Sequence, residues 1–170
     1  MILIQQDNLF PNIQMVRAAS LRVPLYTCAE YNQQFAREED WPGQRSNLLS
    51  ESAPELNDAI HRAVNSIPFF QQLKFHTFVH FRGADAEDWI HQDHEALAGI
   101  IYINPTNVES GTRIYNQQQQ IITDCKYVQN RLVMYSGGHL HQGYGHFGSD
   151  PIKGRTTINL FLDESQAGAR

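Results

Sequence analysis

The nine-residue stretch LKFHTFVHF, Leu73–Phe81, decides the fold of the chain, because its apolar side chains recur at every second position. Side chains on a β-strand point alternately to opposite faces, so residues two apart share a face. One face would carry Phe75, Thr77, Val79 and Phe81, and the other would carry His76, Phe78 and His80. We predict a strand that contributes one face to a hydrophobic core.

The chain after this stretch continues as short strand-like runs separated by turn residues. The runs are rich in β-branched and aromatic side chains: LAGIIYIN (97–104), TRIY (112–115), IITDCKYV (121–128), RLVMYS (131–136) and TTINLFL (156–162). The polar run NQQQQ (116–120) is expected to be a loop. Many short strands without intervening helices are typical of a sandwich or jelly roll. We therefore predict a mainly β (α+β) fold.

A helix is predicted upstream of these strands. Ser52 is a suitable N-cap, Pro54 suits the first turn, and Glu55 lies three residues after the serine. An apolar stripe follows at helical spacing: Leu56, Ile60, Ala63 and Ile67. We predict one domain over residues 1–170, with helical support and outer strands in about 1–70 and a jelly-roll core in about 71–165.

Composition narrows the class of protein further. The 170 residues are 41% hydrophobic, and no apolar run is long enough to span a membrane. A formal net charge of −5 argues against a nucleic-acid partner. Residues 1–10 lack the pattern of a secretory signal, and Cys28 and Cys125 are the only cysteines in the sequence. These features favour a cytoplasmic protein without a disulfide framework, and they leave its oligomeric state open.

Histidines gather in two short windows, WIHQDHE (89–95) and YSGGHLHQGYGH (135–146). If the first window is a strand, His91 and Asp93 share a face. An imidazole and a carboxylate on one face are two of the three ligands of a facial iron(II) site. The third ligand would come from the second window, which offers His139, His141 and His146.

The order of these features resembles the iron(II)/2-oxoglutarate-dependent dioxygenases, and within them the compact, prolyl-hydroxylase-like members. The matching features are the His-x-Asp pair, a strand ending in Asn-Pro, SGTxxY, NRLVMY leading to a histidine, and GRTT entering an apolar strand. The resemblance runs from about Phe75 to Asp163. It implies a double-stranded β-helix (jelly roll) with supporting N-terminal helices.

The resemblance also implies a reaction and a set of ligands. Such enzymes use iron(II), 2-oxoglutarate and O₂ to hydroxylate a C–H bond, releasing succinate and CO₂. The substrate would be a residue of a peptide, such as proline, or a small molecule. The metal ligands would be His91, Asp93 and His141.

The resemblance further assigns the cosubstrate contacts. Arg155 would bind the far carboxylate of 2-oxoglutarate through its forked guanidinium, with the hydroxyls of Thr157 and Tyr102 as further contacts. The segment between His141 and Arg155 is somewhat longer than is usual in the family. Its residues 144–154 could form a loop that closes over the substrate.

A non-catalytic, cupin-type module that binds a metal or a small ligand is the alternative function. Such a module has no need for an arginine and a threonine at the cosubstrate position. Several neighbours of the candidate ligands are expected to have ordinary roles. His94 and Glu95 would be surface residues, and Arg82 and Arg113 would be solvated charges, with a substrate-facing Arg113 as an alternative. Trp89 would pack beside the metal strand, with an aromatic wall of the active site as the alternative.

Overall fold

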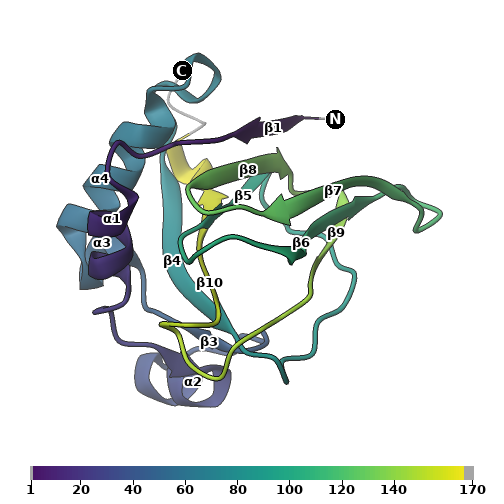
Figure 1. Ribbon diagram of the computed structural model, residues 1–170. Coiled ribbons are helices and arrows are strands. Elements are labelled where there is room, and N and C mark those ends of the chain that lie inside the picture. The colour runs from purple at the N-terminus through teal and green to yellow at the C-terminus, as the bar shows by residue number, and fades with distance from the viewer. Residues whose placement is uncertain (1, 167–170) are drawn as a thin grey trace.

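The computed structural model describes residues 2–166, which form two antiparallel sheets with helices against the larger one (Figure 1). The helices are α1 (Ile13–Ser20), α2 (Cys28–Phe35), α3 (Leu49–Ser52) and α4 (Pro54–Asn65), with 3-10 turns at η1 (Pro68–Phe70) and η2 (Glu164–Gln166). The strands are β1 (Leu3–Gln6), β2 (Tyr26–Thr27), β3 (Gln44–Arg45), β4 (Phe75–Arg82), β5 (Leu97–Tyr102), β6 (Asn107–Tyr115), β7 (Ile121–Tyr127), β8 (Arg131–Ser136), β9 (Leu140–Tyr144) and β10 (Arg155–Leu162).

The strands are arranged as a two-sheet sandwich. The larger sheet has the order β1-β8-β5-β10-β4-β3-β2, and the smaller sheet has the order β7-β6-β9. Each strand run predicted after residue 73 forms, and residues 116–120 make the turn between β6 and β7. The mainly β prediction is confirmed. Strand β9 was not among the strand runs read from composition, because its sequence LHQGY is short and half polar.

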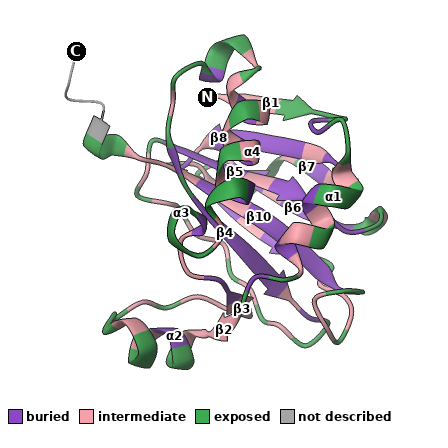
Figure 2. Ribbon diagram, turned by 90° about the vertical axis from the view of Figure 1, so that its left-hand side faces the viewer, coloured by how far each residue is buried: buried purple, intermediate pink, exposed green. Residues whose placement is uncertain are grey.

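Alternation along the strands of the larger sheet separates two hydrophobic cores. Side chains of one parity face the helices, and this core includes Val79, Ile101, Met134 and Ile158 together with Ile60 of α4. Side chains of the other parity face the smaller sheet, and this core includes Tyr102, Val133, Tyr135, Ile114 and Tyr127. Figure 2 shows the buried strands behind the more exposed helices. The alternation predicted for 73–81 thus holds, and its second face leads into the space between the sheets.

The predicted helix forms as α4, but Ser52 does not cap it. Ser52 is the last residue of α3, where its hydroxyl donates to the carbonyl of Leu48 at 2.9 Å. Ala53 takes the N-cap position without a side-chain hydrogen bond. Pro54 begins the helix as predicted, since the N–H that proline lacks would have no partner there. The capping prediction was wrong because Ser52 ends a separate short helix, α3, where its hydroxyl is already hydrogen-bonded.

Ile60 anchors α4 on the larger sheet and is completely buried. We expect Ile60→Ala to lower the free energy of unfolding by about 2–5 kcal/mol, because it removes apolar contact and leaves a void in a packed core. Urea unfolding monitored by circular dichroism measures the change. Met15→Ala on α1 is the matched control, since Met15 is 70% exposed and its truncation should change stability by no more than about 0.5 kcal/mol. Equal losses in the two variants would contradict this core.

Two observations bear on the predictions from composition. No helix within residues 2–166 is long and apolar enough to cross a membrane. Cys28 and Cys125 are both free thiols, and Cys125 is buried between the sheets. The ends of the predicted domain, at residues 1 and 170, lie outside the described residues.

Candidate active site

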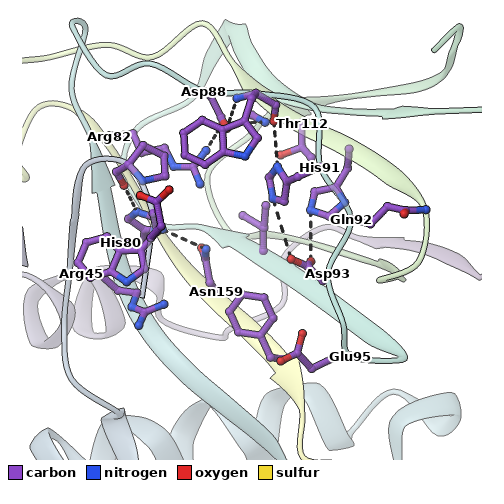
Figure 3. A pocket seen from close by; sticks show the side chains of 18 of the residues that line it. Arg45, His80, Arg82, Asp88, His91, Gln92, Asp93, Glu95, Thr112 and Asn159 are labelled. Atoms are coloured by element: carbon purple, nitrogen blue, oxygen red, sulfur yellow. Dashed lines mark hydrogen bonds and ion pairs between the residues drawn. The ribbon is translucent and has the colours of Figure 1, made fainter. Parts of the chain in front are cut away.

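A cavity of about 530 Å³ lies between the two sheets and is lined by strands from both. Two loops complete its wall, one over residues 38–42 and one over residues 88–95. The volume is within the usual range for small-molecule sites, roughly 300–1,000 Å³. The predicted metal ligands and the predicted carboxylate anchor all line this cavity: His91, Asp93, His141 and Arg155. Figure 3 labels His91 and Asp93 among the lining residues.

Three of these side chains form one compact group that could hold a metal ion. His91, Asp93 and His141 each offer a ligand atom, and these atoms lie within 4.8 Å of one another. The Nε2 atom of His141 is 3.2 Å from Asp93 Oδ2, and the Nε2 atom of His91 is 4.0 Å from Asp93 Oδ1. The structure therefore brings together the three residues that the sequence predicted as ligands.

The segment 89–95 is not a strand. The prediction that strand alternation brings His91 and Asp93 together is therefore wrong. His91 forms a single β-bridge to His141, with two backbone hydrogen bonds of 3.0 and 2.8 Å. The amide of Asp93 then donates to the carbonyl of Gly137 at 2.9 Å. A Cβ at residue 137 would lie 2.1 Å from the carbonyl oxygen of Glu95, so only glycine lets the loop approach this closely. Backbone bonds to the β8–β9 region, not strand alternation, bring Asp93 beside the imidazoles.

Both imidazoles are oriented with Nε2 toward the carboxylate. The Nδ1 atom of His91 lies 2.9 Å from the carbonyl of Trp89, and that of His141 lies 2.8 Å from the carbonyl of His139. A carbonyl only accepts hydrogen bonds, so Nδ1 carries the proton and Nε2 keeps a free lone pair. Burial, followed by the neighbouring His141, lowers the pKa of His91. Both effects favour the neutral ring that a metal requires.

The other two candidate histidines of the second window lie outside this group. His139 contributes its backbone carbonyl to His141 rather than its ring. His146 lies near Asp88, with 3.5 Å between Nε2 and Oδ2. Strand β9 pairs with β6 so that His141 lies opposite Ile114. That position in β9 brings His141, and not its neighbours, to His91.

Arg155 begins β10, lines the cavity and is 2% exposed. Its Nη2 donates to the carbonyl of Gly111 at 3.1 Å, and its buried Nε has no hydrogen-bond partner. The ion pairs of residues 2–166 match Arg45 with Glu39 and Arg82 with Asp88, but they leave Arg155 without a carboxylate. Arg155 is therefore a buried cation that can accept an anionic ligand.

The two hydroxyls predicted to contact the cosubstrate are bonded within the protein. Thr157 Oγ1 donates to Asn159 Oδ1 at 2.8 Å, and the Tyr102 hydroxyl donates to Thr112 Oγ1 at 2.9 Å. Neither Thr157 nor Tyr102 lines the cavity, whereas Asn159 and Thr112 do. Burial, as the largest cause, raises the pKa of Tyr102 far above its usual value, so the hydroxyl stays protonated. Direct contact of these two hydroxyls with a ligand stays a prediction.

Two cavity residues do not have the ordinary roles predicted for them. Arg82 is not a solvated charge, because its side chain is 12% exposed and pairs with Asp88. Trp89 is 46% exposed and lines the cavity, which fits the alternative prediction of an aromatic wall and not the packing role. A local sequence pattern cannot predict the burial of Arg82 or the exposure of Trp89, because both depend on how the 83–91 loop packs against β4 and β9.

Other residues near the site have ordinary roles or lie elsewhere. His94 and Glu95 line the cavity but do not belong to the group of three. Arg113 stacks on Tyr144, with 3.9 Å from its guanidinium carbon to the ring centroid, outside the cavity. The predicted closing loop, 144–154, lines no part of the cavity in the described chain.

The 144–154 loop is instead held against the helical side of the protein. Asn104 donates to the carbonyls of Pro151 and Gly154 at 2.9 and 2.7 Å, and Arg17 donates to that of Ile152 at 2.8 Å. These contacts fix the chain immediately before Arg155. The loop therefore holds the start of β10 in place through Asn104 and Arg17, and it does not cover the cavity.

Sequence comparison finds no matching family model and no matching curated protein. Solved structures do match. A prolyl-4-hydroxylase from Pseudomonas putida is 16% identical with a TM-score of 0.60, covering 94% of this chain and 91% of that chain. The 2-oxoglutarate-dependent carbocyclase SnoK from nogalamycin biosynthesis is 11% identical with a TM-score of 0.65, covering 98% and 84%.

A third match is HygX from Streptomyces hygroscopicus, whose structure holds nickel, 2-oxoglutarate and hygromycin B. It is 10% identical with a TM-score of 0.65, covering 93% of this chain and 81% of that chain. These likenesses span nearly the whole chain at low identity, and they establish the fold. The chain has the double-stranded β-helix of the 2-oxoglutarate oxygenases, as the sequence resemblance implied.

Proposed function

We propose that the protein is an iron(II)- and 2-oxoglutarate-dependent oxygenase that hydroxylates a C–H bond of its substrate. One observation carries the proposal: a two-histidine, one-carboxylate group and an arginine without a carboxylate partner line the same cavity. The fold shared with structurally characterised oxygenases supports it. The products besides the hydroxylated substrate would be succinate and CO₂.

The donor atoms fit iron(II). Two neutral imidazoles and one carboxylate form the facial set that non-haem iron oxygenases use, leaving coordination positions for other ligands. The bound metal would supply the site at which O₂ is activated with electrons from 2-oxoglutarate. His91, Asp93 and His141 would hold the ion, and the carbonyls of Trp89 and His139 would keep the imidazoles oriented.

Arg155 would orient the cosubstrate. Its buried guanidinium would take the far carboxylate of 2-oxoglutarate in a charge-assisted pair, which is strong because water is excluded from it. Thr112 lies 3.5 Å from Nη2 of Arg155 and lines the cavity, so its hydroxyl is well placed beside the same carboxylate. Tyr102 donates to Thr112 and would fix the orientation of that hydroxyl.

Trp41 and Trp89 both line the cavity, and the substrate would contact their indole rings. Indole rings offer flat apolar contact with a polar edge, which suits recognition of a side chain or a small ring. A peptidyl residue such as proline or a small molecule is the proposed substrate. The alternative function, a cupin-type binding module, shares the metal group but would not consume 2-oxoglutarate.

We expect manganese(II) and 2-oxoglutarate together to raise the melting temperature by more than the sum of their separate effects. The cosubstrate would bind both the metal and Arg155, so each ligand strengthens the binding of the other. Differential scanning fluorimetry with succinate as the control ligand measures this. Iron(II) and O₂ should then give slow succinate formation from 2-oxoglutarate even without substrate. Cooperative stabilisation without any turnover would favour the binding module, and no cosubstrate effect would contradict the proposed site.

A further inference from the structure

Asp88 is a buried carboxylate in the cavity wall that the proposed chemistry does not use. Its side chain is 3% exposed, and it pairs with Arg82 of β4. His146 lies 3.5 Å away from it. Burial opposes the ionisation of Asp88, but His146 and Arg82 outweigh this effect and keep the pKa of its carboxyl below the ordinary value. The group is therefore an anion at neutral pH, and its charge is compensated within the protein.

The contacts of Asp88 join the two segments that carry the candidate metal ligands. Its Oδ1 accepts from the amide of Trp89 at 2.8 Å, two residues before His91. Its Oδ2 accepts from the amide of Gly143 at 3.1 Å, two residues after His141. Its backbone carbonyl also accepts from Gln142 Nε2 at 3.2 Å. One residue thus fastens the 83–91 loop to β9, next to the His91–His141 bridge.

Gly143 shows how closely these groups meet. A Cβ there would lie 2.9 Å from Asp88 Oδ2 and 3.2 Å from an Nη atom of both Arg82 and Arg155. Two guanidinium groups and one carboxylate therefore converge on this point of β9. Asp88 compensates Arg82, which leaves one net positive charge, on Arg155, beside the cavity.

We propose that Asp88 is a positioning residue that holds the His91 loop against β9 in the geometry needed for metal binding. The inference rests on the proposed metal site. Partners that orient metal ligands typically change metal affinity by roughly 10–100-fold when they are removed. Arg82, by contrast, contacts the carboxylate of Asp88 and neither of the two amides. The hydrogen bonds of Asp88 to the two amides and its ion pair with Arg82 can therefore be tested separately.

The test compares Arg82→Gln with the double variant Arg82→Gln/Asp88→Asn. Arg82→Gln removes the ion pair but keeps both carboxylate oxygens on the amides of Trp89 and Gly143. The double variant removes one of these acceptors without leaving a buried, unpaired guanidinium, which avoids the main cause of misfolding in Asp88→Asn alone. We expect manganese(II) to bind roughly 10–100-fold more weakly to the double variant and within about threefold of wild type to Arg82→Gln.

A second readout needs no metal. Hydrogen exchange of the Trp89 and Gly143 amides is followed by NMR. In the double variant exchange should quicken for at least one of the two, because asparagine keeps a single accepting oxygen, and in Arg82→Gln both should stay near wild type. Equal metal affinities in the two variants, or unchanged exchange in the double variant, would overturn the role of Asp88. If wild type itself bound no manganese(II), the proposed function would fail, while the exchange comparison would still decide whether Asp88 clamps the loop.

Discussion

Asp93→Ala is expected to abolish succinate formation and to weaken manganese(II) binding by more than about a hundredfold. The carboxylate is the only anion in the group of three, and loss of a direct ligand should exceed the roughly 10–100-fold cost of losing an outer partner. The fold should survive. The side chain is 14% exposed, and the ion-pair contacts of its carboxylate are to His91 and His141. Titration calorimetry gives the affinity, and circular dichroism checks the fold.

Asp85→Ala is the matched control for this prediction. Asp85 is an exposed carboxylate of the loop that precedes His91, and it does not line the cavity. Its replacement should leave the affinity for manganese(II) within about twofold of wild type, because solvent and salt screen an exposed charge outside the cavity. Full succinate formation by Asp93→Ala, with its fold intact, would remove Asp93 from the proposed site.

Arg155→Ala is expected to raise the dissociation constant of 2-oxoglutarate by at least about thirtyfold, which corresponds to about 2 kcal/mol. A buried charge-assisted pair would be lost, and no other cavity arginine of the described residues is free of a carboxylate. Manganese(II) affinity without cosubstrate should stay near wild type, because Arg155 is not in the group of three. Calorimetric titration of 2-oxoglutarate into the manganese-loaded protein measures the effect.

Arg155→Lys and Arg113→Gln refine this test. Lysine restores the charge without the two-pronged geometry, so it should recover only part of the affinity. Arg113 stacks on Tyr144 outside the cavity, and Arg113→Gln should bind 2-oxoglutarate as wild type does. An unchanged dissociation constant in Arg155→Ala would place the cosubstrate anchor on another residue.

The fold could be predicted well from sequence because its main signal is local. Alternation along Leu73–Phe81 and the later strand runs depends on the residues themselves, and the structure places β4–β8 and β10 where the pattern indicates. The predicted Ser52 cap was wrong because capping depends on structure outside the local pattern. Whether a serine caps a helix depends on the path of the preceding chain, and α3 occupies that path.

The candidate site was predicted only in part. His91 and Asp93 lie beside each other as predicted, but a β-bridge and a backbone hydrogen bond to Gly137 bring them together, and not a strand. The sequence pattern left three candidate histidines until the family resemblance favoured His141, and the β6–β9 register places that residue beside His91. The Asp88–Gly143 contact joins residues 55 positions apart, and no local pattern carries that information.

In the proposed function, one cavity holds both the metal and the cosubstrate. A crystal structure of the protein grown without oxygen, with iron(II) and 2-oxoglutarate, tests it most directly. We expect one metal ion bound by His91, Asp93 and His141, with 2-oxoglutarate bound to that metal and its far carboxylate on Arg155. A metal ion bound to other residues, or 2-oxoglutarate bound away from Arg155, would contradict the proposed site.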